Sequence, residues 1–367
     1  MQILEVDKIG SAVSLLNLTK TVSVVKLCQQ PKVGDVVAVR ALSESVIYGN
    51  LELPSGRLAK INKGDCLLGV LGKRRALKGF VGDVPEKVRA GDKLHLLNMG
   101  GVIGICKGHH SSLSDAIEVE VLGIACDSSG SSRVLNIGDQ ALPPTNFLKK
   151  GAPVVVVAGT CMNSGKTVAA TEIIKQAAHA RLKVAGAKMS GVACLRDTLN
   201  MQDHGAMATA SFLDCGLPST VDVDDLAPVA KAILNHLNSF APDLIVVELG
   251  DGIVGGYAVD SVLRDAAIKN AISAFVFCAS DYVGVIGGAA VLKNFGIEID
   301  VVAGSVTDSQ MGEDFVQNQF GLNAGNARRD GKRLFELVKK NQPQINTDEH
   351  EFLADLLTEI PNAILSV

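Results

Sequence analysis

The segment from residue 153 to about residue 182 constrains the fold more than any other part of the chain. It begins with the apolar run "PVVVVA", passes through "GTCMNSGKT" and continues with a helical pattern of apolar residues. A buried strand that enters a helix through a glycine loop can present backbone N–H groups to an anion. The loop nearly matches the phosphate-binding pattern of Gly, four residues and Gly-Lys-Thr. However, its first glycine, Gly159, falls one place early, and Thr160 stands at the expected position.

Apolar strands and helical patterns alternate after this segment. Continuous apolar strands separated by helices predict a mostly parallel sheet with helices on both faces. The fold class that we expect is therefore α/β, with a P-loop NTPase domain over residues 147–367. We predict strands at 153–158, 183–187, 243–248, 274–279 and 300–305, with a further short strand at 322–326 as an option, and helices at 165–182, 195–213, 226–240, 260–270 and 283–295, followed by a helical remainder.

Residues 1–146 predict a separate β-rich domain. A chain of 367 residues is longer than one core usually serves. Short apolar runs alternate with glycine-containing turns at a spacing of about 8–12 residues, which is typical of a small barrel or a sandwich. The segment "ALPPTNFLKKG" reads as the interdomain linker. The polar cluster of His109, His110 and Asp115 favours an exposed loop over a metal site, because no third ligand stands at a recognisable spacing.

The composition narrows the range of partners. A net charge of −4 and the lack of Trp argue against broad binding to nucleic acid or to anionic membranes. The longest apolar stretches are far shorter than the roughly 20 residues of a spanning helix, and the first residues do not read as a secretory signal. A reduced, cytoplasmic interior accounts for scattered cysteines without a Cys-x-x-Cys pair. We therefore expect a small-molecule substrate, with a homodimer as an option. The cysteines are at 28, 66, 106, 126, 161, 194, 215 and 278.

The loop and a later acidic segment predict a site for ATP and Mg²⁺. Lys166 would place its ammonium beside the β- and γ-phosphates, and Thr167 would offer its hydroxyl to Mg²⁺. Glu248 ends the apolar strand of "DLIVVELGDG", and a carboxylate at the carboxyl end of a neighbouring parallel strand suits the metal. Asp251 is the second choice. The alternatives are a glycine turn without a ligand and a strand-end role for Glu248. The other nucleotide-binding candidates in the loop are Gly159, Thr160, Asn163, Ser164 and Gly165.

Three short motifs, in order, resemble those of dethiobiotin synthetase and its relatives. "GTCMNSGKT" is similar to that family's Gly-Thr-x-x-x-x-Gly-Lys-Thr loop. The segment from Val247 to Gly252 is similar to its Val-Glu-Gly-x-Gly-Gly, with Leu249 in place of the first glycine. Lys188 matches the family's second lysine, without the proline that follows it there. The resemblance covers roughly residues 153–330 and implies carboxylate-activating chemistry in which Lys188 holds the acceptor or the developing phosphate charge.

The layout also resembles a bacterial two-domain P-loop family of unassigned function. Its members join an N-terminal domain to a loop of the form Gly-Thr-Asp-x-x-Val-Gly-Lys. Cys161 stands here where both families usually carry an acid. A metal role of that acid is therefore lost or moved in this chain.

Further polar residues follow other predicted strands. Arg196, Asp197, Asp203 and His204 fall along one predicted helix, where Arg196 and Asp203 share a face. Asp203 is a candidate metal ligand, and Asp203 or His204 a candidate ligand or base, although a solvated face explains them equally well.

Loops after late strands often hold the base in this fold class. The candidates there are Thr307, Asp308 and Asn326, of which Asn326 is the candidate for binding the nucleotide. Roles in turns and caps are the alternative.

These observations predict an ATP- and Mg²⁺-dependent enzyme that transfers a phosphoryl group to a small, carboxylate-bearing molecule, as a ligase, a synthetase or a kinase. The expected catalytic residues are Lys166, Lys188 and Glu248. The alternative is a nucleotide-switched accessory or regulatory NTPase whose N-terminal domain docks a partner. Such switch proteins usually carry an extra lysine near the loop start, and residues 153–165 contain none. A binder that no longer turns over is a third option.

Overall fold

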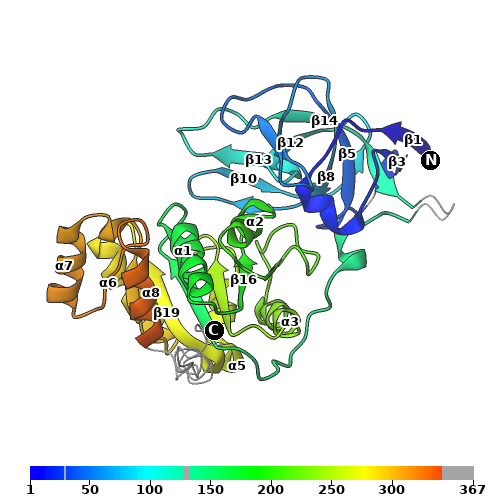
Figure 1. Ribbon diagram of the computed structural model, residues 1–367. Coiled ribbons are helices and arrows are strands. Elements are labelled where there is room, and N and C mark those ends of the chain that lie inside the picture. Colours follow the sequence, from blue (N-terminus) through cyan, green and yellow to red (C-terminus); the bar gives the residue numbers. More distant parts are fainter. Residues whose placement is uncertain (29, 128–132, 341–367) are drawn as a thin grey trace, which may run out of the picture.

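The computed structural model describes residues 1–28, 30–127 and 133–340, which form a β-rich half and an α/β half (Figure 1). Residues 341–367, for which we predicted helix, lie outside the described part. Within that part, no helix has the length and apolar character needed to cross a bilayer. Seven cysteines are free thiols, and the side chain of Cys28 is outside the described part.

The N-terminal half contains a closed ring of five strands. β14 pairs with β5, β5 with β8, β8 with β13, β13 with β12, and β12 returns to β14. The β8–β13 pair is parallel and the other four are antiparallel. The pairing is that of a small barrel, one of the two predicted shapes. The ring strands are β5 (Val36–Ala41), β8 (Cys66–Leu71), β12 (Lys93–Asn98), β13 (Val102–His109) and β14 (Glu118–Cys126).

Shorter elements extend this ring and close its ends. His109 ends β13, and its ring lies 3.2 Å from a carboxylate oxygen of Asp115 in the exposed loop that follows. The additional elements are β1 (Gln2–Glu5), β2 (Lys8–Ile9), η1 (Ser11–Leu16), β3 (Thr21–Val25), β4 (Leu27–Cys28), β6 (Asn50–Glu52), β7 (Leu58–Lys60), β9 (Arg74–Arg75), β10 (Phe80–Asp83), β11 (Val88–Arg89) and η2 (Ile137–Gln140).

The C-terminal half is built on a six-stranded, wholly parallel sheet, which confirms the predicted α/β class. Its order is β17-β16-β18-β15-β19-β20. The valines of β15 are buried on both faces, because helices cover both sides of this central strand. The strands are β15 (Val154–Gly159), β16 (Val184–Ser190), β17 (Ala208–Ser211), β18 (Leu244–Leu249), β19 (Ile272–Cys278) and β20 (Val301–Ala303).

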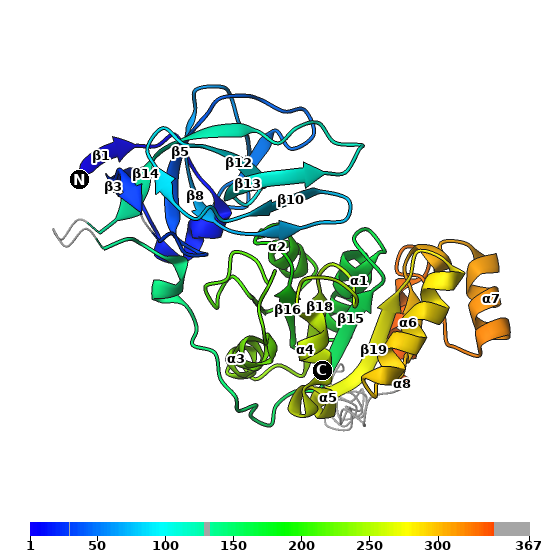
Figure 2. The ribbon, with the colours of Figure 1, turned by 180° about the vertical axis from the view of Figure 1, so that it is seen from behind.

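Helices cover both faces of this sheet, as predicted. Figure 1 shows α1, α2 and α8 on one face, and Figure 2 shows α3, α4 and α6 on the other. Buried residues of α1, α2 and α8 share one apolar cluster with Val155 and Val157, whereas Val154 and Val156 face the opposite cluster. The helices are α1 (Lys166–His179), α2 (Arg196–Asp203), α3 (Ala227–Asn238), α4 (Val259–Arg264), α5 (Ala266–Ala271), α6 (Tyr282–Asn294), η3 (Ser305–Thr307), α7 (Gln310–Phe320) and α8 (Gly331–Lys340).

Three predicted elements differ from the structure. The helix predicted over 195–213 ends at Asp203, since Gly205 adopts a φ of +102°, and Ala208–Ser211 instead pair with β16 as an edge strand. The helix predicted over 260–270 is two short helices, divided at Asp265, whose carboxylate caps the second. The optional strand at 322–326 is reduced to one bridge between Val302 and Ala324.

The two halves share one apolar core. Val13, Leu68 and Val102 of the barrel belong to the same buried cluster as Met189 and Phe212 of the α/β half. The stretch between η2 and β15, in which the predicted boundary at 146/147 falls, has no helix or strand. It is fixed to α3 by hydrogen bonds such as that from the Ala152 N–H to Asn238, at 2.9 Å. The barrel thereby lies over the carboxyl edge of the parallel sheet (Figures 1 and 2).

Candidate functional site

The loop between β15 and α1 has the geometry of an anion cradle. Asn163 and Gly165 adopt φ angles of +63° and +101°, and such changes of backbone hand turn successive N–H groups toward one point. Lys166 is the first residue of α1, and its Nζ donates a hydrogen bond of 2.7 Å to the carbonyl of Cys161. The lysine therefore folds back over the loop. Gly159 and Thr160 begin the loop, and the Thr160 N–H is fixed to the Cys278 carbonyl at 3.0 Å.

Side chains from three elements meet beside this loop. Strand register places Lys188 of β16 opposite Glu248 of β18, with Nζ 2.7 Å from Oε1. The Thr167 hydroxyl donates to the same oxygen at 2.9 Å. Asp197 of α2 approaches the Lys188 ammonium at 3.0 Å. The predicted residues Thr167, Lys188 and Glu248 are thus in direct contact at the carboxyl edge of the sheet.

The two lysines of this cluster differ in their ion pairs: Lys188 has two carboxylate partners, whereas Lys166 has none among the described residues. Burial by itself favours the neutral amine of Lys188, but the carboxylates of Asp197 and Glu248 outweigh it and raise its pKa. Burial and the neighbouring Lys188 ammonium lower the pKa of Lys166. Burial raises the pKa of Asp251, against the opposing charge of Lys166. Lys166, which is 5% exposed, makes no ion pair with any described carboxylate, so an incoming anion would stabilise it.

The cluster fits a magnesium ion held partly by phosphate. Glu248 is 1% exposed, and its Oε2 has no hydrogen-bond partner among the described residues. The Thr167 hydroxyl lies beside it. Within the described part, no three His, Cys, Asp or Glu side chains gather as a metal cage. Mg²⁺ usually takes only one or two carboxylates in addition to substrate phosphates and water, so this donor set is sufficient.

The acids of α2 differ from the expectation. Asp203 ends the helix, is exposed and borders a neighbouring cavity of about 680 Å³ that also touches Thr167. Its metal role stays a prediction. The ring of His204 is bonded to the Asn200 carbonyl at 2.7 Å. The α2 carboxylate that joins the cluster is instead that of Asp197, through its contact with Lys188. The sequence did not predict this role for Asp197. The contact depends on the fold, in which β16 pairs with β18 and α2 packs beside them.

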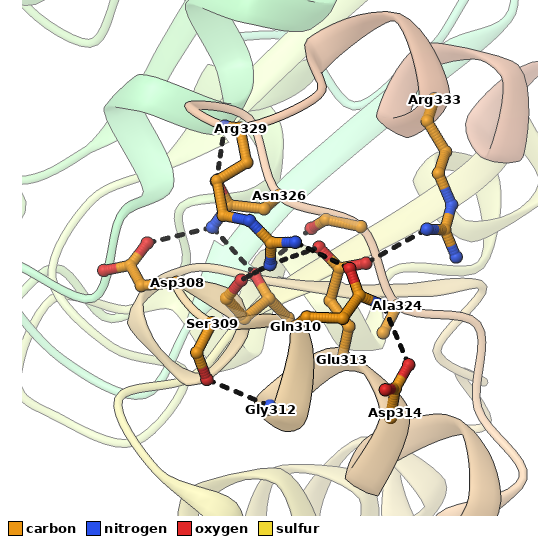
Figure 3. Close-up of polar contacts among 12 residues, drawn as sticks. Asp308, Ser309, Gln310, Gly312, Glu313, Asp314, Ala324, Asn326, Arg329 and Arg333 are labelled. Atoms are coloured by element: carbon orange, nitrogen blue, oxygen red, sulfur yellow. Dashed lines mark hydrogen bonds and ion pairs between the residues drawn. The ribbon is translucent and has the colours of Figure 1, made fainter.

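The loop after β20 is organised by Asn326 (Figure 3). Its amide nitrogen donates to Thr307 at 3.1 Å and to Asp308 at 2.9 Å, and its oxygen accepts the N–H groups of Arg328 and Arg329. These bonds use the whole hydrogen-bonding capacity of the amide. Asn326 therefore shapes the small cavity of about 40 Å³ beside Gly165, and base recognition by its amide stays a prediction.

Ion pairs to one buried carboxylate, that of Glu313, anchor this loop to α7. The carboxylate of Glu313 lies 3.2 Å from the guanidinium groups of both Arg329 and Arg333 (Figure 3). Arg329 also donates to Gln310 at 2.7 Å. The position of Asp308 and Asn326 beside the phosphate loop is fixed by these contacts.

The described part has cavities at both edges of the sheet. One of about 480 Å³ lies between the barrel and the carboxyl edge and is bounded by Lys166, Lys188 and Glu248. A larger one, of about 990 Å³, lies at the amino ends of β15 and β19, near Pro153 and Ile272. Ligands of parallel α/β sheets bind at the carboxyl edge, so the smaller cavity belongs to the candidate site.

No family model matches the chain, and no curated protein matches it significantly. Similar solved structures include the cell division protein FtsY from Thermotoga maritima, with a TM-score of 0.36 and 15% identity over 53% of this chain and 72% of that one. The signal recognition particle 54 kDa protein from Aeropyrum pernix K1 in complex with GDP has a TM-score of 0.34 and 18% identity over 56% and 52%.

The signal recognition particle receptor FtsY from Elizabethkingia anophelis in complex with GDP has a TM-score of 0.35 and 14% identity over 55% of this chain and 67% of that one. None of these three carries the name of dethiobiotin synthetase, so that resemblance stays a prediction from the sequence motifs. Structural similarity at these TM-scores is too low to indicate a function. The proposed function is therefore based on the loop, the sheet and the ion cluster.

Proposed function

We propose that the α/β half binds a nucleoside triphosphate, which we expect to be ATP, together with Mg²⁺, and transfers its γ-phosphoryl group to a small, carboxylate-bearing molecule. The observation that carries this proposal is the meeting of Lys166, a buried lysine without an ion-pair partner among the described residues, with Thr167 and the half-paired carboxylate of Glu248. A phosphate chain with its metal would supply the negative charge that Lys166 lacks and the cation that Glu248 can still bind.

Each residue then has a defined task. Lys166 neutralises the phosphates, while Thr167 and Glu248 orient the metal. Mg²⁺ supplies charge neutralisation and alignment of the phosphate oxygens. Lys188 is held charged by Asp197 and Glu248 and faces the cavity, where it stabilises charge on the transferred group. An acceptor oxygen bonds to the γ-phosphorus as the bond to the β–γ bridging oxygen breaks, and the nucleoside diphosphate leaves. A kinase stops there. In a ligase the acceptor oxygen belongs to a carboxylate, and an amine then bonds to the acyl carbon of the acyl phosphate as the bond from that carbon to the phosphate oxygen breaks, releasing inorganic phosphate and a proton.

A second candidate function is a nucleotide-controlled regulatory protein. Contacts across the two halves favour it: the Asn98 amide donates to the Ala193 carbonyl at 2.8 Å, and the Leu195 N–H donates to Glu52 at 2.7 Å. Ala193 and Leu195 lie just before Asp197, which contacts Lys188 in the ion cluster. A change at the phosphate site could therefore be transmitted through this segment to the barrel. Turnover that requires a small acceptor supports the enzyme, and slow turnover that a protein accelerates supports the regulator.

The test of the phosphate site is calorimetric titration with non-hydrolysable ATP and GTP analogues in the presence of Mg²⁺. Lys166→Ala should weaken binding by about tenfold or more, since a charge-assisted hydrogen bond contributes roughly 1.5–3 kcal/mol. Lys175→Ala, at a more exposed position of the same helix, serves as the matched control and should bind as wild type does. Equal affinity of wild type and Lys166→Ala would show that the nucleotide site lies elsewhere. Tighter binding of the GTP analogue than of the ATP analogue would show that the nucleotide is GTP and not ATP.

A further inference from the structure

The cavity between the barrel and the parallel sheet is lined by both halves of the chain and is open to solvent on one side. The barrel contributes Tyr48, Arg74 and Lys78, and the α/β half contributes Lys166, Lys188 and Glu248. Its volume of about 480 Å³ is within the range of small-molecule sites. A molecule bound there would contact the barrel and at the same time reach the residues to which we assign phosphoryl transfer.

Arg74 of β9 is a buried cation whose described hydrogen-bond partners are neutral, and the carboxylate of Asp251 interacts with its charge from beyond ion-pair distance. It is 4% exposed, and its guanidinium donates to the Leu97 carbonyl and, at 3.4 Å, to the Tyr48 hydroxyl. The guanidinium carbon lies 5.4 Å from the ring centre of Tyr48 and 5.9 Å from that of Phe80. Among the described residues, no carboxylate forms an ion pair with Arg74, and its Nε has no hydrogen-bond partner.

Other charged side chains have the ion-pair partner that Arg74 lacks. Lys231 is 7% exposed and pairs with Asp265 at 2.6 Å. Glu313 is held between two arginines. The neighbouring Arg75 pairs with Asp83 and, at 3.5 Å, with Asp222. Because a buried charge without an ion-pair partner is costly, a site that keeps one is suited to an anion from outside the chain.

The remaining charges on the cavity wall point to the same class of ligand. Arg74, Lys78, Lys166, Lys188 and Arg196 line it, against the carboxylates of Asp197, Glu248 and Asp251. Lys188 already pairs with Asp197 and Glu248. The positive excess is local, since the whole chain has a net charge of −4. Phosphates bound at Lys166 would neutralise the positive charge on the α/β side of the cavity. The positive charges of Arg74 and Lys78 on the barrel side would remain available to a second anion.

We propose that this cavity holds the phosphoryl acceptor, a small molecule whose carboxylate is bound by the Arg74 guanidinium, with a second, nucleophilic oxygen directed toward Lys188. The planar fork of arginine matches the two oxygens of a carboxylate. This assignment rests on the proposed phosphoryl transfer, and it makes the N-terminal barrel one half of the active site.

The experiment is ligand-observed NMR with a library of small carboxylic acids and their matched primary amides. The protein is loaded with Mg²⁺ and a non-hydrolysable ATP analogue. Acids, and not the amides, should bind the wild type, and Arg74→Gln should weaken them by about tenfold or more. Arg75→Gln is the matched control and should retain the binding. Tyr48→Phe, a milder change, removes the hydroxyl that accepts a 3.4 Å hydrogen bond from the Arg74 guanidinium, and should weaken the acids a few-fold.

Titration of the nucleotide analogue separates the two proposals. If wild type and Arg74→Gln bind the nucleotide analogue equally, while the acids lose affinity in Arg74→Gln and keep it in Arg75→Gln, both proposals are supported. Acid binding that is absent in wild type, or that survives both Arg74→Gln and Tyr48→Phe, would overturn the carboxylate site and leave the nucleotide site intact. Arg74-dependent binding of phosphomonoesters without the acids would overturn the substrate class. Nucleotide binding that is absent in wild type, or that Lys166→Ala leaves unchanged, would instead be the failure of the proposed function itself.

Discussion

Gly165 shows how a single residue fixes the phosphate loop. It has a φ of +101°, and a Cβ added there would lie 2.8 Å from the Cα of Gly304 at the end of β20. Gly165→Ala therefore combines backbone strain with a collision between two main chains. The strain alone costs about 1–2 kcal/mol. We expect the free energy of unfolding, measured with urea, to fall by more than this amount, and nucleotide binding to weaken as the loop moves.

Gly91→Ala is the matched control for this prediction. Gly91 has a φ of +94°, but a Cβ added there meets nothing within 4 Å. The control should show the strain without the collision. If both variants lose the same free energy of unfolding, the close approach of Gly165 and Gly304 does not constrain the loop.

Helix α2 receives its N-terminal cap from the other half of the chain. Its own cap residue, Leu195, has no side chain that could accept a hydrogen bond, and the Leu195 N–H donates instead to Glu52 of β6. The same buried carboxylate accepts from Ser11 and from the Cys194 thiol. Glu52→Gln would present an amide to these donors. We expect a loss of about 2 kcal/mol or more in the free energy of unfolding, measured with urea.

Glu44→Gln is the control for the Glu52→Gln prediction. Glu44 is exposed and lies 3.7 Å from Lys60, and surface pairs of this kind contribute about 0–1 kcal/mol. Glu44→Gln should therefore leave the free energy of unfolding almost unchanged. An equally small effect of Glu52→Gln would mean that the cap of α2 contributes little to holding the two halves together.

The elements also show what could be predicted from sequence. β15, its loop and α1 are contiguous, so apolar pattern and motif predict them, and with them Lys166 and Thr167. Glu248 follows from the end of an apolar strand, and Lys188 was predicted from the resemblance to the dethiobiotin synthetase family. β17 was missed because "ATAS" carries no strand pattern and becomes a strand only by pairing with β16. Asp197, Glu52 and Arg74 were missed as parts of the site because contacts between segments distant in sequence bring them there, and no local pattern records such contacts.

At the scale of the whole molecule, the barrel and the α/β half share one buried apolar cluster. Two such halves cannot separate without exposing that cluster to water. We therefore expect one cooperative transition in differential scanning calorimetry of the full chain, and Mg²⁺ with a nucleotide analogue should move it as a unit to higher temperature. Two resolved transitions, only one of which responds to nucleotide, would show that the halves unfold independently.

The order of strands in the sheet has a consequence for synthesis on the ribosome. The central strand, β15, pairs only with β18 and β19, which are made long after it, and the loop that follows it rests on Cys278 and Gly304. A nascent chain cannot close its phosphate loop until almost all of the sheet has been translated. Pairings between such distant segments form slowly, and β15 emerges as an unpaired run of valines. Nucleotide can therefore stabilise the finished chain but offers no protection to an incomplete one.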